Sequence, residues 1–162
     1  MKQLSIVSKP SPVGVLTLIA SESGLRAILW PNDKPGRVRF EEDLVENASN
    51  PYIRKASDQL DEFFAGTRDY FDIPLDLVGT EFQIAVWTAL QQIPFGETTS
   101  YGTMAEDLGK PTAARAVGAA VGRNPLSIVI PCHRVVGKNG SLTGFAGGLN
   151  AKVSLLDLES ER

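Results

Sequence analysis

The first third of the chain carries short runs in which apolar and polar residues alternate. This period of two is typical of β-strands, because successive side chains of a strand point to opposite faces of a sheet. Clusters of Pro, Ser and Gly separate the runs and favour turns. The pattern predicts three short antiparallel strands and a following loop at 31–36; the strands are Leu4–Ser8, Val13–Ala20 and Leu25–Trp30.

A helical pattern follows between Asn50-Pro51, a typical helix start, and Gly66, a typical helix end. Its apolar residues recur at three- and four-residue spacing: Ile53, Ala56, Leu60, Phe63 and Phe64. Residues 73–78 then predict either a short strand or an extended linker. Because the chain changes from β-rich and acidic to helical at Gly79-Thr80, we expect two domains, residues 1–78 and 79–162.

The second half of the chain is mostly helical in pattern. It predicts helices at about 81–92, 101–108, 112–122 and 149–158. Thr80 and Ser100 are suitable N-caps for the first two, and the apolar run at 127–130 predicts a short strand. The expected fold class is therefore α+β, with a small β-rich N-terminal domain (an antiparallel sheet plus a helix) and a mostly helical C-terminal domain.

The two middle helices are joined by Gly109-Lys110-Pro111 and have the pattern of a helix-turn-helix. The second of them is built from small residues: Ala113, Ala114, Ala116, Gly118, Ala119 and Ala120. Small side chains allow close approach, either to a neighbouring helix or to the wall of a DNA groove. Arg115, in the middle of this helix, favours the groove.

The net charge of −3 at pH 7 conceals an uneven distribution. Residues 1–107 hold 9 Lys or Arg and 16 Asp or Glu, which sum to −7. Residues 108–156 hold 6 Lys or Arg and no acidic residue, and residues 157–162 carry −2. The total argues against a protein that coats nucleic acid, whereas the basic stretch predicts a local footprint for a polyanion. A Gly- and Ala-rich segment that happens to lack acids is the alternative.

Composition limits the class of protein. The 162 residues, 43% hydrophobic and 22% charged, are typical of a soluble globular protein. No apolar run approaches the roughly 20 residues that span a bilayer, and Met1–Leu4 shows no signal-peptide pattern, so we expect a cytoplasmic protein without a membrane partner. A single Cys and a single His exclude a disulfide framework and a structural zinc site.

Cys132 is the only soft nucleophile in the chain, and the only His stands beside it. The thiolate is the reactive form, and His133 and Arg134 offer the base and the positive field that favour it. If the segment is extended, neighbouring side chains point in different directions, so His133 acts directly, through a water or not at all. The competing interpretation is a buried structural Cys; Pro131 favours a rigid, shaped turn instead.

This region resembles the active site of the O6-alkylguanine-DNA alkyltransferases. The resemblance is strong over residues 79–159, and residues 1–78 fit only the general outline of that family's N-terminal domain. The matching segments are Pro131-Cys132-His133-Arg134-Val135, Asn124-Pro125, Arg115-Ala116-Val117-Gly118, Tyr101-Gly102 and Gly147-Gly148-Leu149.

The resemblance implies a DNA-repair protein that acts once, with alkylated double-stranded DNA as its partner and no cofactor. The Cys132 thiolate takes the alkyl group from O6 of a guanine that has been flipped out of the duplex, and O4-alkylthymine is a possible further substrate. His133 is placed between a water near Cys132 and the carboxylate of Glu159, which orients the imidazole and favours its charged form. Tyr101 helps to rotate the nucleotide and donates a proton towards the leaving guanine.

The resemblance also assigns residues to DNA and to the base. Arg115 is an arginine finger that enters from the minor groove, and Asn124 braces the turn that carries Cys132. Three small residues, Ala114, Ala116 and Gly118, lie against the sugar-phosphate backbone. The residues at the alkylated base are Val135, Phe145 and Ala146. Many members have Tyr at the position of Phe145 and Ser at that of Ala146, so a phenol contact is lost here, while the backbone N–H of residue 146 is kept.

The first 78 residues contain no Cys or His, so the zinc that some relatives carry there is excluded and no metal is expected. We expect a monomer, in the cytoplasm and associated with the nucleoid if the source is bacterial. The alternative function is a non-catalytic helix-turn-helix sensor of alkylated DNA, but the related alkyltransferase-like proteins lack the reactive Cys. A Cys-His hydrolase or acyl transferase is a third hypothesis; it would turn over repeatedly and would not need Arg115.

Overall fold

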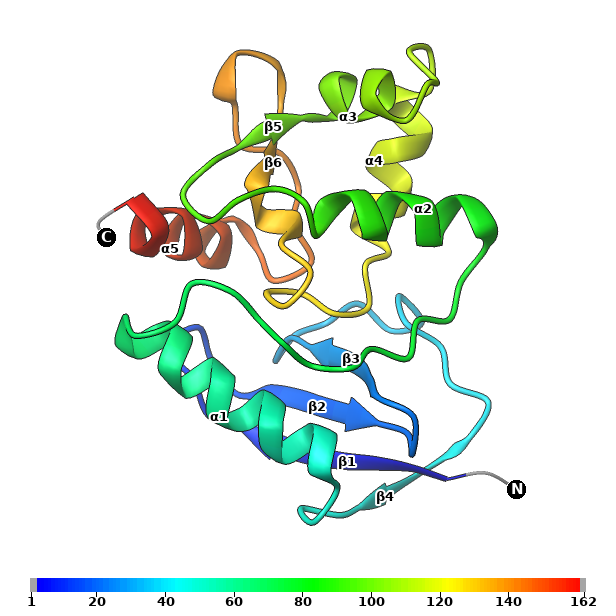
Figure 1. Cartoon of the computed structure of the whole chain (residues 1–162), viewed down its shortest axis with the longest axis vertical. Coiled ribbons are helices and arrows are strands. Elements are labelled where there is room, and N and C mark those ends of the chain that lie inside the picture. The colour runs from blue at the N-terminus through cyan, green and yellow to red at the C-terminus, as the bar shows by residue number, and fades with distance from the viewer. Residues whose placement is uncertain (1–2, 161–162) are drawn as a thin grey trace. The chain divides into compact units, whose positions relative to one another are not determined.

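A computed structural model of the protein describes residues 3–160 and shows two compact units (Figure 1). The chain up to Val78 forms the first unit, and the chain from Gly79 forms the second. The first unit contains the sheet and one long helix, and the second is mostly helical. The α+β fold class expected from the sequence is therefore confirmed.

The first unit is built on a four-stranded sheet. Its strands are β1 (Gln3–Lys9), β2 (Leu16–Ala20), β3 (Leu25–Leu29) and β4 (Asp43–Glu46), in the order β3-β2-β1-β4. The three predicted strands pair antiparallel, as expected. The sequence pattern missed β4, which pairs parallel with β1 at the edge of the sheet. All four residues of β4 are exposed, so the strand carries no apolar face that its sequence could reveal.

The long helix of this unit, α1 (Pro51–Ala65), packs against β1, β2 and β3. The Asn50 side chain accepts hydrogen bonds from the first backbone N–H groups of the helix, and Gly66 ends it with a φ of 87°. The apolar stripe is buried as predicted at Ile53, Ala56, Leu60 and Phe63. Residues 73–78 are extended and pair with the sheet only through one bridge, between Leu75 and Leu25.

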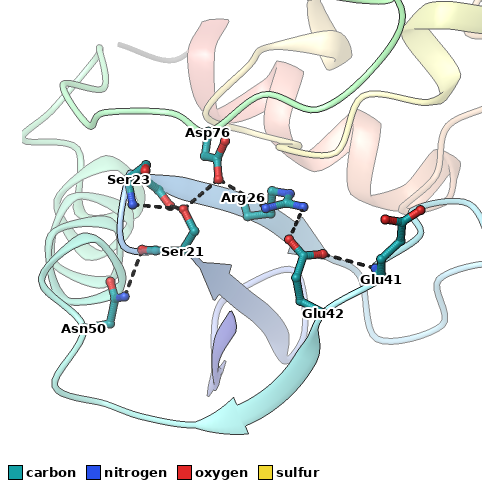
Figure 2. A network of polar contacts seen from close by, with 8 residues as sticks. Ser21, Ser23, Arg26, Glu41, Glu42, Asn50 and Asp76 are labelled. Carbon is teal, nitrogen blue, oxygen red and sulfur yellow. Dashed lines mark hydrogen bonds and ion pairs between the residues drawn. The ribbon is translucent and has the colours of Figure 1, made fainter. Parts of the chain in front are cut away.

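The first unit also contains a polar network on the wall of a groove of about 460 Å³ (Figure 2). The Arg26 guanidinium donates to Glu42 Oε2 at 2.7 Å and to Asp76 Oδ2 at 3.2 Å. The Ser21 hydroxyl donates to the same Asp76 oxygen at 2.6 Å, and Asn50 Nδ2 donates to the Ser21 carbonyl at 3.1 Å. The network therefore ties β3 to the loop before β4 and to the extended segment at Asp76.

Between residues 79 and 160, the second unit contains four helices and a small parallel sheet. The helices are α2 (Glu81–Leu90), α3 (Tyr101–Asp107), α4 (Ala114–Gly122) and α5 (Leu149–Ser160). Two two-residue strands pair in parallel, β5 (Thr99–Ser100) and β6 (Val135–Val136), and neither was predicted because two residues carry no periodic signal. Two 3₁₀ turns complete the unit, η1 (Cys132–Arg134) and η2 (Lys138–Gly140).

Helices α3 and α4 form the predicted helix-turn-helix. Gly109, with a φ of 74°, ends α3, and the Lys110 N–H donates to Ala105 O at 2.9 Å. Helix α4 begins at Ala114, two residues later than predicted. Its inner face is buried at Val117, Ala120 and Val121, and Trp87 Nε1 of α2 donates to Ala120 O at 2.8 Å.

The predicted strand at 127–130 is wrong. The segment folds into a tight buried turn in which Ile128 has a φ of 76° and Ser127 bridges Ile130. A short apolar run predicts a buried strand by pattern alone, and here burial on all sides, not pairing, explains the apolar residues. No helix within residues 3–160 is long and apolar enough to cross a membrane.

Candidate active site

The turn at 124–130 shapes the backbone that leads to Cys132. Asn124 Nδ2 donates to Ile130 O at 2.9 Å, and Asn124 Oδ1 accepts from the Leu126 N–H at 2.9 Å. The side chain of Asn124 is 1% exposed, so these bonds are shielded from water. Within the turn, β-branched Ile128 adopts a left-handed conformation that such residues rarely take. Strained backbone of this kind is concentrated at functional sites.

Cys132 begins the 3₁₀ turn η1, so the extended backbone considered for this segment is wrong. Its N–H donates to Ile130 O at 2.7 Å, and its side chain is buried. Three residues make one turn of a 3₁₀ helix, so consecutive side chains point about 120° apart. The side chains of Cys132, His133 and Arg134 therefore leave the turn in different directions.

His133 and Arg134 both bind the carboxylate of Glu159 on α5. His133 Nε2 lies 2.6 Å from Glu159 Oε2. The Arg134 guanidinium donates to both carboxylate oxygens, at 2.8 and 2.9 Å, and also to Ile93 O at 2.6 Å. The Gly96 N–H adds a longer bond of 3.3 Å to Glu159 Oε1. Glu159, near the end of α5, is thus 3% exposed, and both of its carboxylate oxygens accept hydrogen bonds.

Burial by itself would raise the pKa of Glu159. The hydrogen bonds from His133 and Arg134, together with the positive charge of Arg134, outweigh that effect and lower the pKa to about 2. Glu159 is therefore a carboxylate at neutral pH, and a carboxylate only accepts hydrogen bonds. It follows that His133 donates the Nε2 proton to it.

His133 is completely buried, and this burial lowers its pKa below 6.5. Glu159 opposes the shift and favours the charged form, as the resemblance implies, but the positive charges of Arg134 and Lys152 add to the lowering. The imidazole is therefore neutral at pH 7. With hydrogen on Nε2, its Nδ1 is an acceptor, and Nδ1 makes no hydrogen bond to any residue in the described range.

Lys152 is a member of this site that sequence reasoning missed. Its side chain on α5 is 1% exposed, and Nζ donates to Val135 O at 2.7 Å. Burial lowers the pKa of Lys152, while the nearby Cys132 acts in the opposite direction. The ammonium and the Cys132 sulfur therefore interact electrostatically. Lys152, Leu155 and Glu159 share one face of α5 at helical spacing, but this spacing does not indicate a neighbouring thiol.

Two of the residues expected at the alkylated base, Val135 and Phe145, lie close to Lys152. Val135 is buried on β6, and its carbonyl is held by Lys152. Lys152 Nζ also lies 5.9 Å from the centre of the Phe145 ring, a cation–π distance. Ala146 is half-buried in the same Gly-rich loop. Phe145 therefore contributes an aromatic face beside the ammonium group, without the hydroxyl group that a tyrosine would add.

The helix-turn-helix supplies a second group of residues. Tyr101 is the first residue of α3, and its hydroxyl lies 2.6 Å from Thr143 Oγ1. On α4, Arg115 and Ala116 are exposed, and Ala114 is half-buried. Gly118 faces the Tyr101 ring, since a Cβ at Gly118 would lie 3.6 Å from it. The predicted residues thus form a buried cluster around Glu159 and a separate exposed stretch on α4.

Two family models match the chain, one in each unit. Residues 8–77 match the ribonuclease-like domain of 6-O-methylguanine DNA methyltransferase, and residues 81–161 match the DNA binding domain of the same family. The chain belongs to the 6-O-methylguanine DNA methyltransferase family. Individual relatives support this assignment over nearly their whole length.

The chain is 47% identical over 149 residues to the methylated-DNA–protein-cysteine methyltransferase of Methanosarcina acetivorans, covering 92% of this chain and 94% of that protein. It is 48% identical to the protein of the same name from Mycobacterium leprae, covering 96% and 92%. A crystal structure of Mycobacterium tuberculosis OGT in complex with DNA superposes with a TM-score of 0.85 and 43% identity, covering 98% of this chain and 93% of that one.

Proposed function

We propose that the protein repairs DNA by a single, irreversible transfer of an alkyl group from O6 of guanine to Cys132. The observation that carries this proposal is the neutral His133, whose Nε2 is bound by ionised Glu159 and whose Nδ1 remains an acceptor beside Cys132 in the chain. A nucleophilic thiol needs such a base, and a lone Cys suits a thioether that is never resolved.

The reaction balances without a cofactor. The Cys132 proton passes to His133 Nδ1, through a water as the family resemblance implies, and leaves a thiolate. A sulfur lone pair attacks the alkyl carbon, so the S–C bond forms as the bond from carbon to O6 breaks. The bonding electrons go to the base, which takes up a proton at N1 and becomes guanine. His133 returns its proton to water, so the thiol hydrogen finally replaces the alkyl group on the base.

The charges around the thiol favour this path. Lys152 is buried and interacts electrostatically with Cys132, and a positive charge in such surroundings favours the thiolate over the thiol. Glu159 holds the imidazole in the tautomer that accepts a proton and stabilises the imidazolium formed afterwards. Arg134 shares that carboxylate, which keeps Glu159 ionised despite its burial. We assign Cys132 and His133 to the chemistry, and Glu159, Arg134 and Lys152 to its electrostatics.

For DNA, we propose that helix α4 approaches the minor groove. Arg115 is exposed on α4 and fills the space of the flipped nucleotide, and Ala114, Ala116 and Gly118 leave room for the backbone. Tyr101 assists the rotation, and Val135, Phe145 and Ala146 surround the base. The four exposed basic residues of 108–156, Lys110, Arg115, Arg123 and Lys138, supply the sequence-independent attraction. The DNA complex of the similar M. tuberculosis protein supports a DNA partner.

We further propose that residues 1–78 and 79–162 act as separate domains, of which the second carries the site. The protein works as a monomer on chromosomal DNA, and therefore in the cytoplasm or bacterial nucleoid. Alkyl groups larger than methyl and O4-alkylthymine are further substrates to assay.

Intact-mass spectrometry after incubation with a duplex containing O6-methylguanine tests the proposal. We expect one methyl group per protein, located on the peptide that carries Cys132, and an equal loss of the damaged base. Cys132→Ser is the control, and it should bind the same duplex without gaining mass. An unmodified protein with the base intact would support a sensor instead, and repeated turnover would support a hydrolase.

A further inference from the structure

The hydroxyl groups of Tyr101 and Thr143 are 2.6 Å apart, a short hydrogen bond in which either oxygen can donate. The two residues lie 42 positions apart in the chain. Both are shielded in part from solvent, Tyr101 at the start of α3 and Thr143 in the loop before α5. None of the roles assigned to the site so far uses Thr143.

Neighbouring structure holds this contact from both sides. Tyr101 directly follows β5, and Gly137 directly follows β6, the parallel partner of β5. Thr143 lies against Gly137, since a Cβ there would come 3.0 Å from the Thr143 methyl group. On the opposite side the Tyr101 ring faces Gly118 of α4. One strand pair therefore sets the positions of both hydroxyl groups.

We propose that Thr143 is a positioning residue that orients the phenol proton of Tyr101 towards the leaving guanine. This inference rests on the proposed transfer to Cys132. A phenol has only one proton, so when Tyr101 donates it to the base, the Tyr101 oxygen must be the acceptor in the bond with Thr143. Thr143 Oγ1–H is then the donor. The chain Thr143 to Tyr101 to base then stabilises negative charge as it develops on guanine.

No covalent step is required of Thr143. Its hydroxyl keeps its proton throughout, and Tyr101 keeps its proton as a hydrogen-bond donor. Thr143 contributes one neutral hydrogen bond to Tyr101, and this bond becomes stronger in the transition state. Loss of one such bond slows a reaction by about two- to tenfold.

The test is a set of single-turnover transfer rates on duplex DNA containing O6-methylguanine. Thr143→Val keeps the shape and removes the hydroxyl, and we expect it to slow transfer by about two- to tenfold. Thr143→Ser keeps the hydroxyl and should restore the rate to within about twofold of the wild type. Ser141→Ala is a matched control, because it removes from the same loop a hydroxyl that donates to Lys138 O at 3.2 Å. It should leave the rate unchanged.

A double-mutant cycle separates positioning from a general effect on the loop. In a Tyr101→Phe background, Thr143→Val should have no further effect, because the hydroxyl on which Thr143 acts is gone. Equal slowing by Thr143→Val in both backgrounds, or a Thr143→Ser variant as slow as Thr143→Val, would overturn the inference. So would wild-type speed in Thr143→Val. In each of these cases the wild-type protein still transfers the methyl group to Cys132, so the proposed function stands. A wild-type protein that gains no methyl group would instead contradict the proposed function itself.

Discussion

Each unit of the protein contains an arginine bound to carboxylates, and the two arrangements behave differently. In the first unit, Arg26 is shared by Glu42 and Asp76 at the wall of an open groove (Figure 2). In the second, Arg134 binds both oxygens of Glu159, and His133 binds the same carboxylate. The side chain of Glu42 is 19% exposed, whereas that of Glu159 is 2% exposed.

This difference in burial explains what each network does. The hydrogen bond from Arg26 lowers the pKa of Glu42. At Glu159, burial works against ionisation, so the carboxylate stays charged only through His133 and Arg134. The same burial keeps His133 neutral with Nδ1 as an acceptor. A partly exposed ion pair supports the fold, whereas a fully buried one also sets the protonation of its neighbour.

The strongest test of this contrast removes one charge from each network. Glu159→Gln should slow transfer by about a hundredfold or more, because His133 loses the partner that sets its tautomer. It should also cost about 3–5 kcal/mol of unfolding free energy by leaving Arg134 buried without a carboxylate. Glu42→Gln should cost less than about 1 kcal/mol and leave transfer unchanged. Single-turnover rates and urea unfolding measure both effects.

Similar losses in the two variants would show that burial does not distinguish the networks. A Glu159→Gln variant that transfers at wild-type speed would show that the charge of Glu159 is not needed for His133 to act.

The pH dependence gives the next largest effect. Transfer requires neutral His133, so the rate should fall about tenfold per pH unit below the pKa of His133. That pKa lies below 6.5, so the acid limb should have its midpoint below 6.5. A midpoint above 6.5 would contradict the neutral imidazole.

Stability should fall over the same acidic range. The native pKa of His133 lies below its unfolded value of 6.5, so unfolding takes up a proton below pH 6.5. The native pKa of Glu159 is about 2 against 4.5 unfolded, so its contribution is complete above pH 4.5 and is lost towards pH 2. Both groups therefore destabilise the native state as pH falls, which unfolding titrations at several pH values can measure.

Two exposed arginines on helices allow a comparison for DNA. Arg115→Ala on α4 should slow repair of duplex DNA by about ten- to a hundredfold, because base extrusion loses its support. The same variant should react with free O6-alkylguanine within about twofold of the wild-type rate. Arg54→Ala on α1 is the matched control, exposed on the helix of the first unit, and should change neither rate. Equal losses with duplex and free base would exclude the finger role of Arg115.

The smallest effect concerns two buried asparagines. Asn50 caps α1 and bonds to Ser21 O, and Asn124 spans the turn before Cys132. Asn50→Ala should cost about 0.5–2 kcal/mol of stability as a lost cap, and Asn124→Ala about 1–3 kcal/mol as lost buried hydrogen bonds. Only Asn124→Ala should also slow transfer, by about three- to tenfold, because the Cys132 backbone shifts. A reduced transfer rate in Asn50→Ala as well would show that a loss of stability by itself slows transfer.

Sequence reasoning succeeded where a residue's role depends on its near neighbours. Alternation predicted the three antiparallel strands, and Asn50, Thr80 and Ser100 cap helices as expected. It failed where the apolar pattern does not report strand pairing. Strand β4 has no buried face, and the apolar run around Ile128 is a turn because Asn124 and Ile130 close it.

The candidate site divides in the same way. Cys132, His133 and Arg134 form a motif in the sequence, and the resemblance to the alkyltransferases implies roles for Glu159 and Tyr101. Lys152 and Thr143 were missed, because nothing in the chain next to them indicates a thiol or a phenol. Their partners, Cys132 and Tyr101, are brought to them by the packing of α5 and by the β5–β6 pair.

The sequence by itself determined the class of fold, the one nucleophile and the one base, since a single Cys and a single His leave no other choice. Only the tertiary structure decided the state of those groups. The pKa of a side chain depends on its burial and on charges from distant parts of the chain. Folding buries His133, brings Glu159 to its Nε2 and brings Lys152 within electrostatic reach of the thiol, and the order of the residues along the chain determines none of these contacts.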